Sequence, residues 1–522
     1  MGWPGRFPDR SRDGSPFGGR KAVAVGAIVV AVAAACARGE AARPAPSEIL
    51  TTPRPAAAFT PESPAPAAPP DAATVARFAK VSKLLDDAVA AHRLPGAVLV
   101  VGHGGKVAFH RAYGSRKLAG EPGLDGLPAP AEPMTEDTIF DLASLTKILA
   151  TATAVMQLYE QGAVALDDPV QRYLPDFNTA NDPRRAEVTV RMLLTHTSGE
   201  TGDVNLGDPW GLDKADKEEG IHRALTTPLE SGPGGGFRYS DINFILVGAL
   251  IEKVTGEALD AYVQRHVFEP LGLHETHYLP PAGACGPHRT IGAAIAWVPD
   301  GEARHACPAG TWSTSLLPRI APTARDEEGR ADPGKNPDLD RLLRGTVQDT
   351  TARRMGGVAG HAGVFSTAHD VGIFAQALLD RLAGRPSEFP LAQTTLELMT
   401  SPQQPGHTPA QLQAANEATR AAAAKWPNRP DPLLAARYPA IAGQNLRGLG
   451  WDIDTVQSAP RGAVFPIGSF GHTGFTGTSV WLDPRSDTYV VLLSNSIHVR
   501  GSTPISDLRG EVATAAAQAL GL

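Results

Sequence analysis

The sequence predicts an α+β fold with an antiparallel sheet, because a helix, a β-hairpin and a second helix follow one another. Residues 71–92 repeat apolar side chains at the spacing of an amphipathic helix. Residues 96–101 and 107–113 are apolar runs joined by His103-Gly104-Gly105, a pattern typical of a β-hairpin. The second helix is expected over residues 144–159, a nearly all-apolar stretch that indicates burial.

The rest of the folded chain is read from the same kinds of pattern. Further helices are expected at residues 188–199, 245–255, 371–379 and 505–520, and the second of these ends at Gly256. Strands are expected at residues 448–453, 469–482 and 488–494. Residues 200–236, 285–344 and 401–440 are polar or rich in glycine, proline or alanine, so we expect loops and a surface excursion there.

The bulk composition describes an ordinary globular protein of 522 residues, with 42% hydrophobic and 20% charged residues. A net charge of −7 gives no sign of the basic surface that nucleic-acid binding needs. The three cysteines lack metal-type spacing, and His274-Glu-Thr-His277 does not match a zinc motif, so no metal or other cofactor is expected. Cys285 and Cys307 either pair as a disulfide or remain two free thiols.

Residues 1–36 resemble an export signal, with a basic start and an apolar run over residues 22–35. That run is shorter than the roughly 20 residues that span a bilayer. It ends in Ala33-Ala-Ala-Cys36, which resembles a lipobox except that alanine replaces the usual leucine. Three alternatives therefore remain: lipidation of Cys36, ordinary signal cleavage and an uncleaved anchor. Residues 37–70 are rich in alanine and proline and read as a tether. We expect a cell-envelope protein, attached to the membrane only through this end, with its folded domain over residues 71–522.

The candidate nucleophile is in Ser144-Leu-Thr-Lys147, at the start of the second helix. A serine and a lysine three residues apart lie on one helix face, so the amine can act on the hydroxyl. A capping serine beside a lysine that extends to the surface would give the same tetrapeptide. The tetrapeptide alone does not decide between these interpretations.

Two further motifs follow in order, Tyr239-Ser-Asp241 and His472-Thr473-Gly474, and Leu193-Leu-Thr-His-Thr-Ser-Gly199 precedes them both. With these segments the chain resembles the serine β-lactamase and penicillin-binding-protein superfamily, in its class C-like branch of β-lactamases, esterases and D-peptidases. The family has Ser-x-x-Lys, Tyr-x-Asn and Lys-Thr-Gly at the three places. The resemblance covers roughly residues 75–520.

The resemblance implies a two-part fold with the active site in the cleft between the parts. One part is an antiparallel sheet flanked by the first and last helices, and the other is mostly helical. It also implies that the third motif lies on a sheet-edge strand facing Ser144. Ser144 would attack a carbonyl to form an acyl-enzyme, with Lys147 or Tyr239 as the base. The backbone N–H groups of Ser144 and Phe475 would form the oxyanion hole.

Two departures from the family pattern bear on the substrate. Asp241 replaces an asparagine whose amide can donate to a substrate carbonyl, whereas a carboxylate only accepts. Asp241 would also favour a protonated Lys147 and shift the role of base towards Tyr239. His472 replaces a charged lysine, and a neutral imidazole holds a substrate carboxylate less well. Thr473 and Gly474 follow it in the expected substrate-binding strand.

Two further residues are less decided, His361 in the glycine-rich turn over residues 356–363 and Gln348 before that turn. His361 either lines the cleft or pins its loop by hydrogen bonding, and the second interpretation is preferred. Gln348 stands where esterase-like members of the branch often have histidine. We expect an exported serine hydrolase that cleaves an ester or amide in a small-molecule or peptidoglycan-type substrate. The alternatives are a peptidoglycan D,D-carboxypeptidase or endopeptidase, a β-lactamase, a sensor that acylates but turns over poorly, and a structural envelope lipoprotein.

Overall fold

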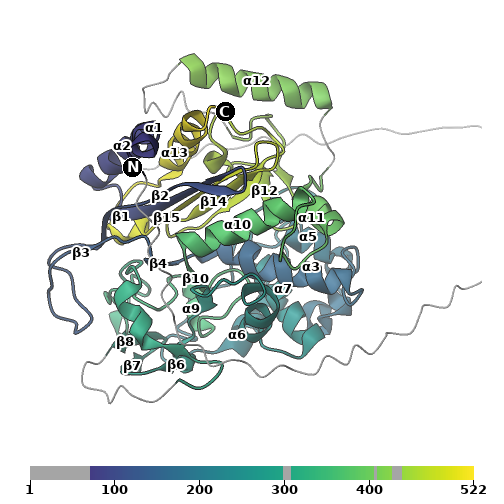
Figure 1. The fold of residues 1–522 in the computed structure, drawn as a ribbon. Helices are drawn as coiled ribbons and strands as arrows, with labels where there is room; N and C mark the ends of the chain where they lie inside the picture. The colour runs from purple at the N-terminus through teal and green to yellow at the C-terminus, as the bar shows by residue number, and fades with distance from the viewer. Residues whose placement is uncertain (1–70, 298–306, 405–407, 426–437) are drawn as a thin grey trace, which may run out of the picture. The chain divides into compact units, whose positions relative to one another are not determined.

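The computed structural model describes residues 71–297, 307–404, 408–425 and 438–522 (Figure 1). The predicted export segment and tether, residues 1–36 and 37–70, lie outside the described residues. Within the described part, no helix combines the length and the hydropathy needed to cross a membrane.

An eight-stranded antiparallel sheet forms the centre of the fold, in the order β11-β12-β13-β14-β15-β1-β2-β3. Both ends of the folded chain supply its strands, which confirms the predicted α+β architecture. The strands are β1 (Gly96–His103), β2 (Lys106–Lys117), β3 (Glu132–Pro133), β11 (Leu446–Arg447), β12 (Asp452–Asp454), β13 (Phe470–Thr473), β14 (Ser479–Asp483) and β15 (Thr488–Ser494).

Short strands form three smaller sheets elsewhere in the described residues. They are β4 (Ile139–Asp141) with β10 (Val364–Thr367) and β5 (His277–Tyr278), β6 (Ala284–Cys285) with β9 (Trp312–Ser313), and β7 (His288–Ile291) with β8 (Ala294–Trp297). The α-helices are α1 (Ala72–Arg77), α2 (Ala79–Ala90), α3 (Thr153–Glu160), α4 (Pro183–Glu187), α5 (Val190–Leu194), α6 (Lys217–Thr226), α7 (Asp241–Thr255), α8 (Leu259–Val263), α9 (Thr350–Arg354), α10 (Ala368–Leu382), α11 (Gln393–Thr400), α12 (Pro409–Lys425) and α13 (Ser506–Ala519).

Helices cover both faces of the large sheet, and the side-chain alternation of β1 shows how. Val98 and Val100 belong to the main core, with α10 packed over them, whereas Leu99 and Val101 pack into a second core beneath α2 and α13 (Figure 1). Successive strand side chains point to opposite faces, so a strand buried on both sides is apolar throughout. The first and last helices thus share one face, as predicted.

The helical part surrounds α7, which is buried along most of its length and ends where Gly256 adopts a φ of 71°. That C-cap was predicted. Helices α6 and α12 were not, because loops were expected over their residues. The missed signal for α6 is a cap, in which the Asp216 carboxylate accepts a hydrogen bond from the Glu219 N–H.

The first predicted helix is present but divided. Residues 72–90 form α1 and α2, and the backbone leaves helical geometry at Phe78, with a ψ of 15°. Val75 is exposed as a result, although the sequence pattern placed it on the buried side. Phe78, Val81 and Leu85 are buried as expected.

The strand of the third motif is not at the sheet edge, contrary to the expectation from the family resemblance. β13 lies between β12 and β14, because residues 446–454 fold back and add β11 and β12 outside it. The pairing of β12 with β13 is limited to Asp452 and Gly471. His472 and Thr473, which follow, therefore extend past this short contact towards the nucleophile.

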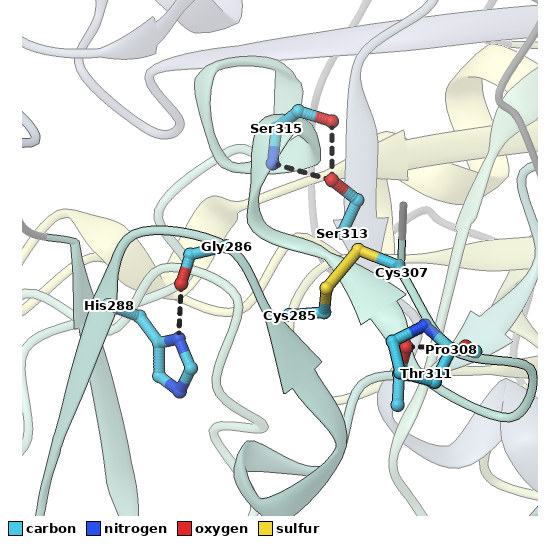
Figure 2. Close-up of a disulfide and its surroundings, with 8 residues drawn as sticks. All are labelled: Cys285, Gly286, His288, Cys307, Pro308, Thr311, Ser313 and Ser315. Carbon is cyan, nitrogen blue, oxygen red and sulfur yellow. Dashed lines mark hydrogen bonds between the residues drawn. A yellow bond between two sulfur atoms is a disulfide. The ribbon is translucent and has the colours of Figure 1, made fainter. Parts of the chain in front are cut away.

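Cys285 and Cys307 form a disulfide, which decides between the two alternatives left open by the sequence (Figure 2). Cys285 ends β6, which pairs in parallel with β9 through Ala284 and Trp312. The bond joins residues 22 positions apart in the chain. It thereby closes a long loop of the region that the sequence marked as irregular.

Removing this disulfide is expected to lower the free energy of unfolding by about 3 kcal/mol, because closing a loop of this length restricts the unfolded chain. The measurement is urea unfolding of a Cys285→Ser, Cys307→Ser protein beside the parent. The parent measured with excess reductant is the control and should unfold like the double variant. Equal stability of all three samples would contradict the expectation.

Candidate active site

The candidate nucleophile, Ser144, stands on a strained turn between β4 and a buried helix. Ala143, which precedes Ser144, has a φ of 47°, a left-handed conformation that is costly for a residue with a Cβ atom. A 3-10 turn (Ala143–Leu145) then leads into a π-helical segment (Lys147–Ala152) and α3. The sequence predicted regular helix here. The Thr153 hydroxyl donates to the Ile148 carbonyl at 2.8 Å, which fits the wider π-helical turn.

Lys147 is fully buried and uses its ammonium group as a triple donor. It donates to Ser144 Oγ at 3.0 Å, to Asp241 Oδ1 at 2.6 Å and to the His361 carbonyl at 3.0 Å. Burial alone would lower the pKa of Lys147, but the charges of Asp241 and Tyr239 outweigh burial and raise that pKa above its ordinary value. A protonated lysine has no lone pair to accept the Ser144 proton. The geometry therefore favours Lys147 as a donor and not as the base.

Tyr239 lies on the other side of the Lys147 ammonium, whose Nζ is 5.1 Å from the centre of the phenol ring. Hydrogen-bonding interactions with Lys147 and Ser144 act on the Tyr239 hydroxyl. Burial raises the pKa of Tyr239, and the Lys147 charge acts in the opposite direction. A deprotonated Tyr239 would present a free oxygen beside Ser144, and the adjacent Lys147 charge favours that form.

His196, from the Leu193–Gly199 segment, supports Tyr239. The two rings stack with centroids 4.4 Å apart and an interplanar angle of 30°. The imidazole Nδ1 of His196 accepts from the Ser240 N–H and faces the Asn243 amide, both at 3.2 Å. Asn243 in turn accepts from the Ser198 hydroxyl at 2.6 Å. This network fixes the ring on which the tyrosine rests.

His472 is buried beside Tyr239, with ring centroids 6.1 Å apart. Its Nδ1 lies 2.8 Å from the Thr473 carbonyl, which can only accept, so Nδ1 carries the proton. Burial, with the charges of Arg447 and Lys147, lowers the pKa of His472 well below its ordinary value. His472 is therefore a neutral imidazole whose Nε2 is an acceptor.

The loop after β13 is tied directly to the nucleophile turn. The Thr476 and Thr478 hydroxyls donate to the Asp141 and Leu142 carbonyls at 2.8 and 3.0 Å. A Cβ atom on Gly474 would lie 2.4 Å from the Leu142 carbonyl oxygen, so only glycine permits this approach. Phe475 follows with 73% of its surface exposed. The predicted oxyanion residue thus sits on a loop held against the Ser144 turn.

A cavity of about 660 Å³ borders the site, and Phe475 and Gln348 are among the residues that line it. Its wall comes from loops around residues 206–212, 324–335 and 497–502. Arg353 pairs with Asp326 at 2.9 Å, and further acidic and basic side chains line the same wall. This polar cavity is connected to the candidate site through Phe475.

His361 pins its loop, which is the interpretation that the sequence analysis preferred. Its Nε2 lies 2.8 Å from Asp349 Oδ1 and pins the glycine-rich loop, while its carbonyl contacts Lys147. Burial would lower the pKa of His361, but Asp349 outweighs burial and raises it. Gln348 donates its backbone N–H to Asp141 at 2.7 Å and is not paired with the nucleophile by any described contact.

Asp349, Asp141 and Arg447 are the residues near the site that sequence reasoning missed. Asp141 accepts from the Ala143 and Gln348 N–H groups and so holds the strained turn. The available signal for Arg447 was a lone cation in an otherwise apolar and glycine-rich stretch, Leu446–Trp451. In the described part of the chain, no three histidine, cysteine or acidic side chains are grouped as metal ligands.

Comparisons with known proteins give the family. The beta-lactamase family model matches residues 81–509. A putative D-alanyl-D-alanine carboxypeptidase of Escherichia coli (strain K12) is 27% identical over 424 residues, which cover 79% of this chain and 80% of that protein. Esterase EstB of Burkholderia gladioli is 37% identical over 226 residues, 40% of this chain and 53% of the esterase.

A solved structure shares the fold as well. The class C beta lactamase from Rhodobacter sphaeroides superposes with a TM-score of 0.53 at 19% identity, over 85% of this chain and 99% of that one. At this identity the likeness concerns the fold alone. The family model, however, covers most of the chain. The chain therefore belongs to the beta-lactamase family and is a serine hydrolase.

Proposed function

We propose that this protein is an exported serine hydrolase that cleaves an ester or amide through an acyl-enzyme on Ser144. The observation that carries the proposal is the buried Lys147 ammonium, which donates to Ser144 and lies 5.1 Å from the Tyr239 ring, beside the Gly474–Phe475 loop. In a structural lipoprotein nothing would require a buried lysine aimed at a serine on a strained turn.

The proposed reaction has two steps. Tyr239 takes the Ser144 proton as Oγ attacks the carbonyl, and then gives it to the leaving group as the acyl-enzyme forms. Water next attacks the acyl group and loses a proton to Tyr239, which passes that proton to Ser144 Oγ as the acid product leaves. The N–H groups of Ser144 and Phe475 stabilise the oxyanion, and each such donor is worth about 3 kcal/mol of barrier.

His472 favours substrates without a carboxylate next to the scissile bond. A neutral imidazole presenting the acceptor Nε2 offers neither charge nor a donor to that group. β-Lactams and D-Ala-D-Ala peptides both carry the carboxylate. We therefore place an uncharged ester first, and a D,D-carboxypeptidase, as the Escherichia coli relative is named, second.

The test compares a neutral p-nitrophenyl ester, nitrocefin and a D-Ala-D-Ala peptide at equal concentration. We expect steady turnover of the ester at a kcat/KM at least tenfold above those of the other two, with a transient acyl adduct in the intact mass. Peptide cleavage above ester cleavage would replace the first proposal by the second. A burst without turnover would identify a sensor, and no adduct with any substrate would reject the acyl-enzyme.

We also expect kcat/KM to rise with pH through the neutral and alkaline range. The base must be deprotonated, and burial raises the pKa of Tyr239, so its protonated form dominates at neutral pH. Asp241 raises that pKa further. An Asp241→Asn variant should therefore move the rising limb of the profile to lower pH, which initial rates from pH 6 to 10 would show. A limb that stays in place would contradict Tyr239 as the base.

A further inference from the structure

Arg447 is a buried cation close to the catalytic groups. It ends β11, its side chain has no exposed surface, and its guanidinium carbon is 5.5 Å from the centre of the Phe237 ring. One nitrogen donates to the Gly450 carbonyl at 3.0 Å. Nε and Nη1 have no hydrogen-bond partner among the described residues. A buried guanidinium left partly unpaired is costly, so its position calls for a reason.

The charge of Arg447 is only loosely matched by its carboxylate neighbour. Asp452 Oδ1 is 3.7 Å from Nη1, too far for a hydrogen bond. The two Asp452 oxygens accept instead from the Thr455 and Ser458 hydroxyls at 2.7 and 2.9 Å. A second buried arginine of this sheet region, Arg461, is different, because it lies 2.9 Å from Asp454. The field of Arg447 is therefore less cancelled locally than that of Arg461.

A row of neighbouring aromatic rings connects Arg447 with the active site. Phe237, His196 and Tyr239 follow one another with centroids 6.3 and 4.4 Å apart, and His472 stands 6.1 Å beyond. Arg447 acts electrostatically on His196 and His472, and the Tyr239 charge acts on Arg447 in return. Arg447, His196 and His472 are all buried, so the interaction is weakly screened.

We propose that Arg447 supplies, from the neighbouring strand, the positive charge at the back of the catalytic cleft that His472 no longer carries, and that this charge favours ionisation of Tyr239. The inference rests on the proposed function, in which Tyr239 is the base. Position 472 has lost the family's lysine, and Asp241 offsets the charge of Lys147. Arg447 is then a buried cation that interacts electrostatically with Tyr239 and has no hydrogen-bonded carboxylate. It is a positioning residue and touches no substrate.

The charged and titratable groups that face Tyr239 come from each element packed around it. They are Lys147 on the nucleophile helix, Asp241 on α7, His196 after α5, His472 on β13 and Arg447 on β11, with the His361 and Asp349 pair behind Lys147. Both neighbouring histidines are held neutral by burial and by the cations. Removing Arg447 therefore leaves Lys147, paired with Asp241, as the only cation of this set besides His361.

The first test reads Tyr239 directly and needs no activity. The ultraviolet absorbance of tyrosinate is followed during an alkaline titration of the purified protein, and the titration of Tyr239→Phe is subtracted to isolate Tyr239. Replacing Arg447 by methionine is expected to move the Tyr239 midpoint up by about one pH unit, the usual effect of one nearby charge. An unchanged midpoint would overturn the proposal.

The second test uses the pH profile of kcat/KM for the neutral ester. In Arg447→Met the rising limb should move to higher pH by about one unit. At a fixed pH on that limb, kcat/KM should therefore fall roughly tenfold. Two variants should restore the pH position of the parent limb, because each restores a cation. They are Arg447→Lys and the double variant Arg447→Met, His472→Lys. Arg461→Met is the matched control and should keep the parent limb, even if its Tm falls.

The outcomes separate the inference from the function on which it rests. An equal shift in Arg461→Met and Arg447→Met would mean a general structural effect and would overturn the proposal. So would failure of both lysine variants to restore the limb while they fold. A parent protein with no esterase activity but a Tyr239 midpoint that still moves with Arg447 would reject the proposed function and keep the electrostatic role.

Discussion

Replacing Ser144 with alanine is expected to lower kcat for ester hydrolysis more than about a thousandfold, because no acyl-enzyme can form without Oγ. The folded state should change little. The Ser144 side chain is partly exposed and accepts a single described hydrogen bond, from Lys147. Initial rates with the p-nitrophenyl ester, together with Tm, provide the measurement.

Ser315→Ala is the control for this prediction, since Ser315 is an exposed serine near the disulfide whose hydroxyl contacts that of Ser313 (Figure 2). It should keep both the parent rate and the parent Tm. Full activity in the Ser144→Ala protein would reject the mechanism. A residual rate that survives with no acyl adduct would show instead that water attacks the bound ester directly.

The candidate catalytic residues could be identified from the sequence because each motif is local. Ser144 and Lys147 are one helical turn apart, and the motifs around Tyr239 and His472 are short enough to be read as they stand. The effect of Asp241 on Lys147 could also be predicted, since a carboxylate next to a lysine keeps the lysine charged. The structure places that carboxylate 2.6 Å from Lys147.

The contacts that the sequence did not reveal are those between distant segments. Asp349 reaches His361 through the packing of a loop, and Arg447 approaches the site only because β11 and β12 are added outside β13. No periodicity encodes which strand becomes the neighbour of another. The π-helical turn after Ser144 was missed for a related reason, since propensity does not distinguish it from regular helix.

Lys147→Met is expected to lower kcat/KM for ester hydrolysis by about a thousandfold or more. It should also lower the free energy of unfolding by about 2 to 3 kcal/mol. Activity falls because Ser144 loses its donor and Tyr239 loses the adjacent charge. Stability falls because the Asp241 carboxylate is left without its partner. Asp241 keeps 23% of its side chain exposed, so the loss stays below that of a fully buried pair. Urea unfolding and kcat/KM measure the two effects.

The double variant Lys147→Met, Asp241→Asn separates these two causes. Asparagine removes the stranded charge, so most of the stability should return, while activity should stay lost because no ammonium faces Ser144 and Tyr239. If the double variant regained activity, the lysine would matter only by neutralising Asp241. If it regained neither, the packing of the buried lysine stem would outweigh its charge. The expected pattern, stability without catalysis, would assign to Lys147 a chemical role beyond holding the fold.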